Sequence, residues 1–281
     1  MVIQDLNRTL EGANKRHILM DVMYDSAIKS APLIIFCHGY KGFKDWGAWP
    51  LMSKAFAASG FAVLKFNFSH NGGTVKHPID FPDLEAFGNN NYTKELEDLD
   101  RVITWAHAFY TNHPNINSSN ITLLGHSRGG GIVSLKAAED SRIKKIISLA
   151  GVSDFKSRFP EGPELDRWKE TGVRYVLNGR TKQQMPHYYQ FYKDFITNEG
   201  KLTIQTAVKQ LKLPFLIIHG NADTSVSINE ALALHKWNPK SQLTVIEGAN
   251  HVFGSCHPWK SRELPPFFRQ IHREITHFIN N

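Results

Sequence analysis

The chain has 281 residues, of which 41% are hydrophobic and 21% are charged, a composition typical of a folded globular protein. Its net charge of +7 arises from 33 Lys and Arg spread along the chain beside 26 Asp and Glu, which argues against a nucleic-acid partner. No signal-peptide pattern and no apolar run of about 18 residues is present, so we expect a cytoplasmic protein that does not bind or cross a membrane.

Short apolar segments alternate with helical patterns along the chain. The predicted strands are residues 17–24, 32–37, 61–68, 121–124, 145–150, 214–219 and 242–247. Apolar residues at helical spacing predict helices over 96–110 and 268–278. The alternation predicts an α/β fold with a mostly parallel twisted sheet, helices on both faces and a single domain spanning 1–281.

One interval is too long for an ordinary connection between parallel strands. It separates the predicted strands 145–150 and 214–219, and most such crossovers are much shorter. We interpret residues 152–205 as a helical cap-like insertion within the domain rather than as a domain of its own. The segment is rich in aromatic residues, so it is suited to covering a site.

The two cysteines, Cys37 and Cys256, follow no CxxC or Cys/His ligand spacing. They predict reduced structural thiols rather than a disulfide framework or a zinc site. The histidines form no HExxH or other compact metal pattern, so the sequence indicates no metal site.

The segment GHSRGG begins at Gly125, where a strand pattern gives way to a helical one. Residues 125–129 match Gly-x-Ser-x-Gly, the pattern of a sharp strand-to-helix turn that exposes a serine nucleophile. The Gly-x-x-x-x-Gly-Lys-[Ser/Thr] and Gly-x-Gly-x-x-Gly spacings of phosphate-binding turns are absent. Ser127 is therefore the predicted nucleophile.

A serine hydroxyl needs a general base and a group that orients the base. Asp223 follows one apolar strand and His251 follows the next, so Ser127, Asp223 and His251 occur in the order typical of one serine hydrolase architecture. Asp154 is an alternative acid, because it also follows a predicted strand. His257 is an alternative base, although it lies further from the strand end.

The predicted nucleophile also needs donors for the negative charge that develops on a carbonyl oxygen. The turn HGYKG follows the strand 32–37, and we expect the backbone N–H groups of Tyr40 and Arg128 to supply these donors. An ordinary glycine-rich turn is the alternative explanation of HGYKG. His126, next to the nucleophile, is a candidate substrate contact.

These motifs resemble the α/β-hydrolase superfamily over nearly the whole chain from about residue 17. HGYKGFKDWG, GHSRGG, HGNADTSV and GANHVF occur in that family's order. With FNFSHNG, they look most like the branch of dienelactone-hydrolase-like proteins, cinnamoyl or feruloyl esterases and prolyl-oligopeptidase-related peptidases. The resemblance implies a Ser127, Asp223 and His251 triad, oxyanion amides at Tyr40 and Arg128, and no cofactor.

The sequence departs from some members of that superfamily. HGYKG replaces the HGGG of many lipases, and no β-propeller precedes the hydrolase segment as in large oligopeptidases. The nucleophile is Ser rather than the Cys of dienelactone hydrolases or the Asp of haloalkane dehalogenases. Neither the lipase label nor those last two activities therefore transfers to this chain.

The resulting hypothesis is hydrolysis of a small-molecule ester through an acyl-enzyme on Ser127. A short peptide or other amide is the alternative substrate, and a non-catalytic binding module on the same fold is a third hypothesis. The insertion is expected to favour aromatic or anionic acyl groups through Trp168, Arg174, Tyr188 and Tyr189. Simple packing of these rings beneath the insertion is the competing explanation.

Overall fold

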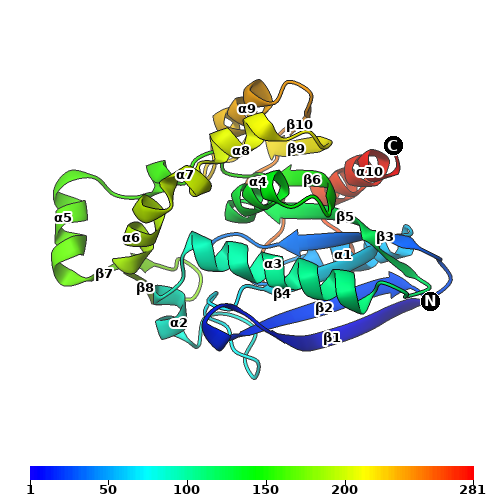
Figure 1. The fold of residues 1–281 in the computed structure, drawn as a ribbon, viewed down its shortest axis with the longest axis horizontal. Coiled ribbons are helices and arrows are strands. Elements are labelled where there is room, and N and C mark those ends of the chain that lie inside the picture. Colours follow the sequence, from blue (N-terminus) through cyan, green and yellow to red (C-terminus); the bar gives the residue numbers. More distant parts are fainter.

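The computed structural model describes residues 1–281, and an eight-stranded sheet forms its centre (Figure 1). The strand order is β1-β2-β4-β3-β5-β6-β9-β10, with antiparallel pairing only at β1/β2 and β2/β4. The strands are β1 (Val2–Glu11), β2 (His17–Asp25), β3 (Ala31–Cys37), β4 (Ala62–Asn67), β5 (Ile116–His126), β6 (Ile143–Leu149), β9 (Phe215–Gly220) and β10 (Gln242–Ile246). The predicted mostly parallel α/β sheet is confirmed.

Helices cover both faces of this sheet. Along β3, Leu33 and Ile35 belong to a core shared with α3 and α4, whereas Ile34 and Phe36 belong to a core shared with α1 and α10. Alternate side chains of a strand point to opposite faces, so a continuous apolar run supplies both cores. The helices outside 152–205 are α1 (Trp49–Ala58), α2 (Leu84–Gly88), α3 (Tyr92–Phe109), α4 (Arg128–Glu139), α9 (Ile228–Trp237) and α10 (Pro266–Asn280), with a short 3-10 turn at Ala13–Lys15.

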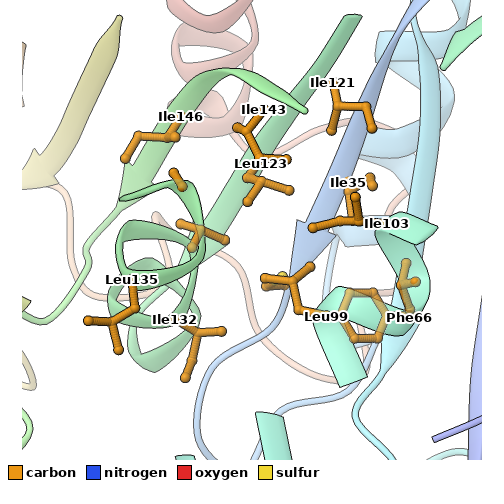
Figure 2. Close-up of a cluster of buried hydrophobic side chains, with 14 of the residues drawn as sticks. Ile35, Phe66, Leu99, Ile103, Ile121, Leu123, Ile132, Leu135, Ile143 and Ile146 are labelled. Carbon is orange, nitrogen blue, oxygen red and sulfur yellow. The ribbon is translucent and has the colours of Figure 1, made fainter. Parts of the chain in front are cut away.

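The larger core lies between the sheet and helices α3 and α4 (Figure 2). Leu99 and Ile103 project from α3, and Ile132 and Leu135 project from α4, toward strand side chains such as Leu123. All of these side chains are buried, and burial of each large aliphatic side chain contributes about 1.5–3 kcal/mol to folding. This packing fixes α4 against the strand that precedes it.

Strand β1 is the one strand of the large sheet that the sequence analysis missed. It lies at the sheet edge, most of its residues are exposed or half-buried, and its register with β2 shifts between Asp5 and Arg8. The bulge interrupts the period-two pattern on which strand prediction depends. The other strands were predicted, although β5 begins at Ile116, earlier than the predicted start at residue 121.

The segment between β6 and β9 extends to one side of the sheet (Figure 1). It contains helices, as expected, and also an antiparallel two-stranded sheet that the sequence analysis did not anticipate. Its elements are a 3-10 turn at Lys156–Arg158, α5 (Gly162–Thr171), β7 (Val173–Leu177), β8 (Gln184–Tyr188), α6 (Gln190–Thr197), α7 (Glu199–Leu202) and α8 (Ile204–Gln210).

None of the helices has both the length and the apolar composition that crossing a bilayer requires.

A buried ionic cluster ties the loop after β3 to its neighbours in the sheet. The Lys44 ammonium lies 2.8 Å from Asp21 and 2.6 Å from Asp45, and Lys65 contacts the same two carboxylates. The Lys44 amide also donates to Asn67 at 2.6 Å. Because the four charges balance and three of the four side chains are almost fully buried, the loop is fixed relative to β2 and β4.

We expect Asp21→Asn to lower the free energy of unfolding by about 3–5 kcal/mol, because two buried ammonium groups would share one carboxylate. Urea denaturation measures the change. Asp5→Asn is the matched control: it breaks a half-exposed pair with Arg8 and should cost less than about 1 kcal/mol. Equal, small losses for the two variants would contradict the stabilising role of the cluster.

Candidate active site

Ser127 occupies the turn between β5 and α4 in a strained conformation. Its φ is 56° and its ψ is −120°, a region that residues with a side chain rarely adopt. The turn requires glycine on both sides: a Cβ on Gly125 would lie 2.2 Å from the Gly129 oxygen, and a Cβ on Gly129 would lie 2.3 Å from the Cys37 oxygen. These glycines let α4 begin directly against β3, with Ser127 at its tip.

Three predicted residues meet at this turn. The Ser127 Oγ lies 3.0 Å from His251 Nε2, and His251 Nδ1 lies 2.7 Å from the Asp223 carboxylate. With Nδ1 donating to the carboxylate, Nε2 is free to accept the serine proton. Asp223 follows β9 and His251 follows β10, so the ends of three parallel strands supply the three groups.

The Asp223 carboxylate is held in its ionised form. Burial opposes its charge, but contacts with His219 and His251 and a hydrogen bond from the Val226 amide at 2.9 Å outweigh that effect. The pKa of Asp223 therefore lies below its ordinary range. A permanent negative charge next to His251 favours a transient imidazolium there.

The alternative acid and base lie elsewhere. Asp154 is exposed, and its carboxylate accepts from the amides of Lys156 and Ser157. His257 Nδ1 accepts from the Gly47 amide at 3.0 Å. The structure brings Asp223 and His251 to the serine and gives both alternatives local structural partners.

The two predicted oxyanion donors lie on either side of the serine. The N–H groups of Tyr40 and Arg128 make no hydrogen bond within the protein. Arg128 is the first residue of α4, where helical N–H groups are free and the helix dipole favours negative charge. A Cβ on Gly39 would lie 2.8 Å from the Ser127 Cβ, so glycine permits the approach of the Tyr40 loop.

Ser127 and His251 open onto a cavity of about 440 Å³. Its apolar wall is largely aromatic and includes Tyr92, Phe155, Phe159, Trp168 and Phe191. A smaller cavity of about 160 Å³ shares Ser127 and His251 with the first and contains Phe43, Trp46 and Trp49. The serine is therefore accessible from two spaces of different size.

The predicted substrate contacts differ in where they lie relative to the two cavities. Trp168 lines the larger cavity, and its Nε1 donates to the His187 carbonyl at 2.7 Å. His126 lines only the smaller cavity, where its Nε2 contacts the His251 carbonyl at 2.9 Å. Tyr188 and Tyr189 line neither of these two cavities.

The strand phase explains why Tyr188 lies outside the larger cavity. Neighbouring residues of β8 point to opposite sides, so His187 faces the larger cavity while the Tyr188 hydroxyl donates to Glu85. The Tyr189 ring packs against Trp168, with ring centroids 5.7 Å apart. No pattern in the sequence identified His187 as a cavity residue.

The Arg128 side chain was also missed. Its Nη1 donates to Glu95 at 3.2 Å, and its guanidinium lies 4.5 Å from the centroid of the Tyr40 ring. Burial works against its charge, but Glu95 outweighs that effect and raises the pKa of Arg128. Burial also raises the pKa of Glu95, although Arg128 opposes that shift.

His187 stays neutral beside these groups. Burial and the nearby charges of Arg128 and Arg174 lower its pKa to about 3. Its Nε2 lies 2.7 Å from the Tyr40 hydroxyl. The neutral ring can therefore accept a hydrogen bond from Tyr40 and hold that residue beside the serine.

The residues described here form no group of three or more His, Cys, Asp and Glu side chains placed to hold a metal ion.

Comparison with known proteins gives matches of three kinds. The sequence model of the alpha/beta hydrolase fold family matches residues 32–183. An uncharacterised 31.7 kDa protein of Escherichia coli is 34% identical over 123 residues, which cover 44% of this chain and only 38% of that protein. The uncharacterised peptidase YtmA of Bacillus subtilis is 26% identical over 227 residues, 80% of this chain and 74% of that protein.

Among solved structures, Est1E from Butyrivibrio proteoclasticus with ferulic acid bound has a TM-score of 0.74. It covers 97% of this chain and 98% of its own, at 18% identity. At that identity the likeness shows the fold alone.

We expect a fluorophosphonate probe to modify Ser127, because the His251 imidazole is placed to take the hydroxyl proton. Mass spectrometry of the peptides locates the label, and His251→Ala should slow labelling by at least about 100-fold. Ser134→Ala is the control, since that hydroxyl is buried in α4 and donates to Gly130. Labelling of another serine, or an unchanged rate in His251→Ala, would contradict the assignment.

Proposed function

This chain belongs to the α/β-hydrolase fold family, and on that premise we propose that it hydrolyses carboxylic esters of small molecules through an acyl-enzyme on Ser127. The observation that supports the proposal most strongly is the continuous hydrogen-bonded chain from the serine to the carboxylate. Its distances are 3.0 Å from Ser127 to His251 and 2.7 Å from His251 to Asp223. Both lie within the range needed for proton transfer and orientation.

The proposed reaction has two halves. Ser127 Oγ attacks the ester carbonyl carbon as His251 takes its proton, and the resulting tetrahedral intermediate expels an alcohol that receives the proton from His251. Water then attacks the acyl-enzyme, again giving a proton to His251, and the acid leaves as Ser127 recovers its hydrogen. Asp223 orients the imidazole and stabilises its charged form throughout.

The N–H groups of Tyr40 and Arg128 are proposed to bind the oxyanion of both tetrahedral intermediates. Their freedom from other hydrogen bonds supports this role. One preorganised donor of this kind contributes about 10²–10³ in rate. The hydrogen bond between the Tyr40 hydroxyl and His187 holds the first donor's loop in place.

Residues 152–205 are proposed to act as a cap within one domain that spans 1–281. Phe155, Phe159, Trp168 and His187 all come from this segment and line the larger cavity. In this proposal the sheet supplies the reacting groups, and the cap determines which acyl groups reach them.

A short peptide or other amide is the second candidate substrate. The similarity to YtmA, which carries the name of a peptidase, favours it. The same groups would serve, with His251 protonating a leaving amine rather than an alcohol.

A cytoplasmic location is part of the proposal. The unpaired thiols of Cys37 and Cys256 support it, since reducing compartments keep cysteines in this form.

Asp223→Asn is expected to lower kcat/KM for p-nitrophenyl butyrate by about 10³–10⁴-fold, because an amide no longer stabilises the charged imidazole or fixes its tautomer. Asp154→Asn is the matched control and should stay within about twofold of the wild type, since Asp154 only caps a turn. A large loss in Asp154→Asn with a small loss in Asp223→Asn would reverse the assignment.

A direct comparison of ester and amide substrates distinguishes the two candidate functions. We expect p-nitrophenyl esters of short acids to be hydrolysed with a kcat/KM at least about 100-fold above that of aminoacyl and dipeptidyl coumarin amides. Ser127→Ala measures the background for both substrate types. Amide turnover equal to or above ester turnover would favour the peptidase candidate.

A further inference from the structure

The larger cavity carries positive charge on its wall and no carboxylate. Its charged lining consists of Lys41, Arg128, Arg158 and Arg174, and no Asp or Glu belongs to the lining. This wall has no part in the proton transfers proposed for Ser127. Unlike a solvated surface patch, these cations lie in a partly enclosed space beside aromatic rings, where water screens charge less effectively.

Two of the four cations have carboxylate partners. Arg158 pairs with Glu230, and Arg174 lies 3.1 Å from Glu164. Lys41 is different, because no carboxylate lies within 4.0 Å of its ammonium group. Lys41 is therefore the cavity cation without a protein counter-ion.

Arg128 has a counter-ion but also unused donors. Its guanidinium carries five N–H groups, and its side chain makes one hydrogen bond, to Glu95. None of its nitrogens is among the fully buried side-chain atoms that lack a partner, and the residue lines the cavity. The remaining donors are thus accessible from the cavity.

Lys41 and Arg128 both lie close to the ring of Tyr40. The Lys41 ammonium lies 4.9 Å and the Arg128 guanidinium 4.5 Å from the centroid of Tyr40. Burial lowers the pKa of Lys41, and repulsion from Arg128 adds to that shift. An anion that binds both groups from the cavity they line would relieve their repulsion, and a carboxylate matches the planar geometry of a guanidinium.

We infer that the preferred ester has an acyl group with a second, ionised carboxylate that Arg128 and Lys41 bind. This inference rests on the proposed function and chooses the anionic acyl group over the neutral aromatic one. The apolar spacer between the two carbonyl carbons lies against aromatic wall residues such as Phe155 and Trp168. Hydrolysis consumes one water and releases a dicarboxylic acid and an alcohol.

The test compares esters that differ only in charge. The p-nitrophenyl half-esters of adipic and pimelic acid carry a free carboxylate. In the corresponding half-amides the p-nitrophenyl ester is kept and a primary amide replaces that carboxylate, so these substrates are neutral and nearly isosteric. We expect kcat/KM to be about 10- to 100-fold higher for the half-esters that carry the carboxylate, the range expected of charge-assisted hydrogen bonds. Equal values would overturn the inference while leaving ester hydrolysis itself established.

Variants assign the preference to the two cations. Lys41→Met and Arg128→Gln should each reduce the ratio of kcat/KM for the charged half-esters to kcat/KM for the neutral half-amides by at least about fivefold, whatever either variant does to turnover of the neutral substrates. Arg128→Gln leaves the Glu95 carboxylate buried without its partner, which can prevent folding. The double variant Glu95→Gln/Arg128→Gln removes both charges and provides the same test if the single variant does not fold. Arg101→Gln is the control, because it removes a charge on the exposed face of α3.

Direct binding separates failure of this inference from failure of the proposed function. Calorimetry on Ser127→Ala should show adipate binding at least about 10-fold more tightly than adipamide, whether or not the wild type hydrolyses esters. Equal or undetectable binding of both would overturn the inference. A carboxylate preference found only on the alcohol side, with 4-acetoxybutyrate over 4-acetoxybutyramide, would overturn the assignment to the acyl group.

Discussion

The close approach of Gly129 to strand β3 is the constraint on which the site depends. A side chain there would meet the Cys37 carbonyl, so any larger residue would push the start of α4 away from the sheet. That displacement would move both the Ser127 hydroxyl and the free N–H of Arg128. The left-handed backbone of Ser127 costs about 1–3 kcal/mol and persists because helix and strand packing leave it no alternative.

The two carboxylates of the site lie further from the cavity than the residues that they contact. The Asp223 carboxylate is buried behind His251, and Glu95 lies behind Arg128, so both negative groups are screened from the cavity by the residue that each one orients. The cavity itself presents cations and the neutral ring of His187. A substrate anion would therefore meet positive charge without repulsion from the carboxylate that supports the base.

Much of the fold, and the three residues of the hydrogen-bonded chain, could be predicted because each leaves a local pattern. Buried strands appear as apolar runs, and Ser127, Asp223 and His251 follow three of them directly. Strand β1 could not be predicted, since an edge position and a bulge erase its alternation. The direction of the side chains along β8 could not be predicted either. Tyr188 was expected to contact substrate because it is aromatic, but its neighbour His187 lines the larger cavity. The partner of Arg128 lies 33 residues away in the sequence, and only the packing of α3 on α4 brings them together.

The backbone and the side chain of Arg128 belong to different parts of this site. Its N–H lies at the start of α4, where the elbow geometry fixes it whatever the side chain is. Its guanidinium contacts Glu95 and lies 5.4 Å from the ring centroid of Phe191 in α6. Under the proposed function, a change of the side chain would therefore alter which acyl group is bound without removing the amide proposed to bind the oxyanion. The proposal thus assigns selectivity to the side chain and transition-state stabilisation to the backbone of a single residue.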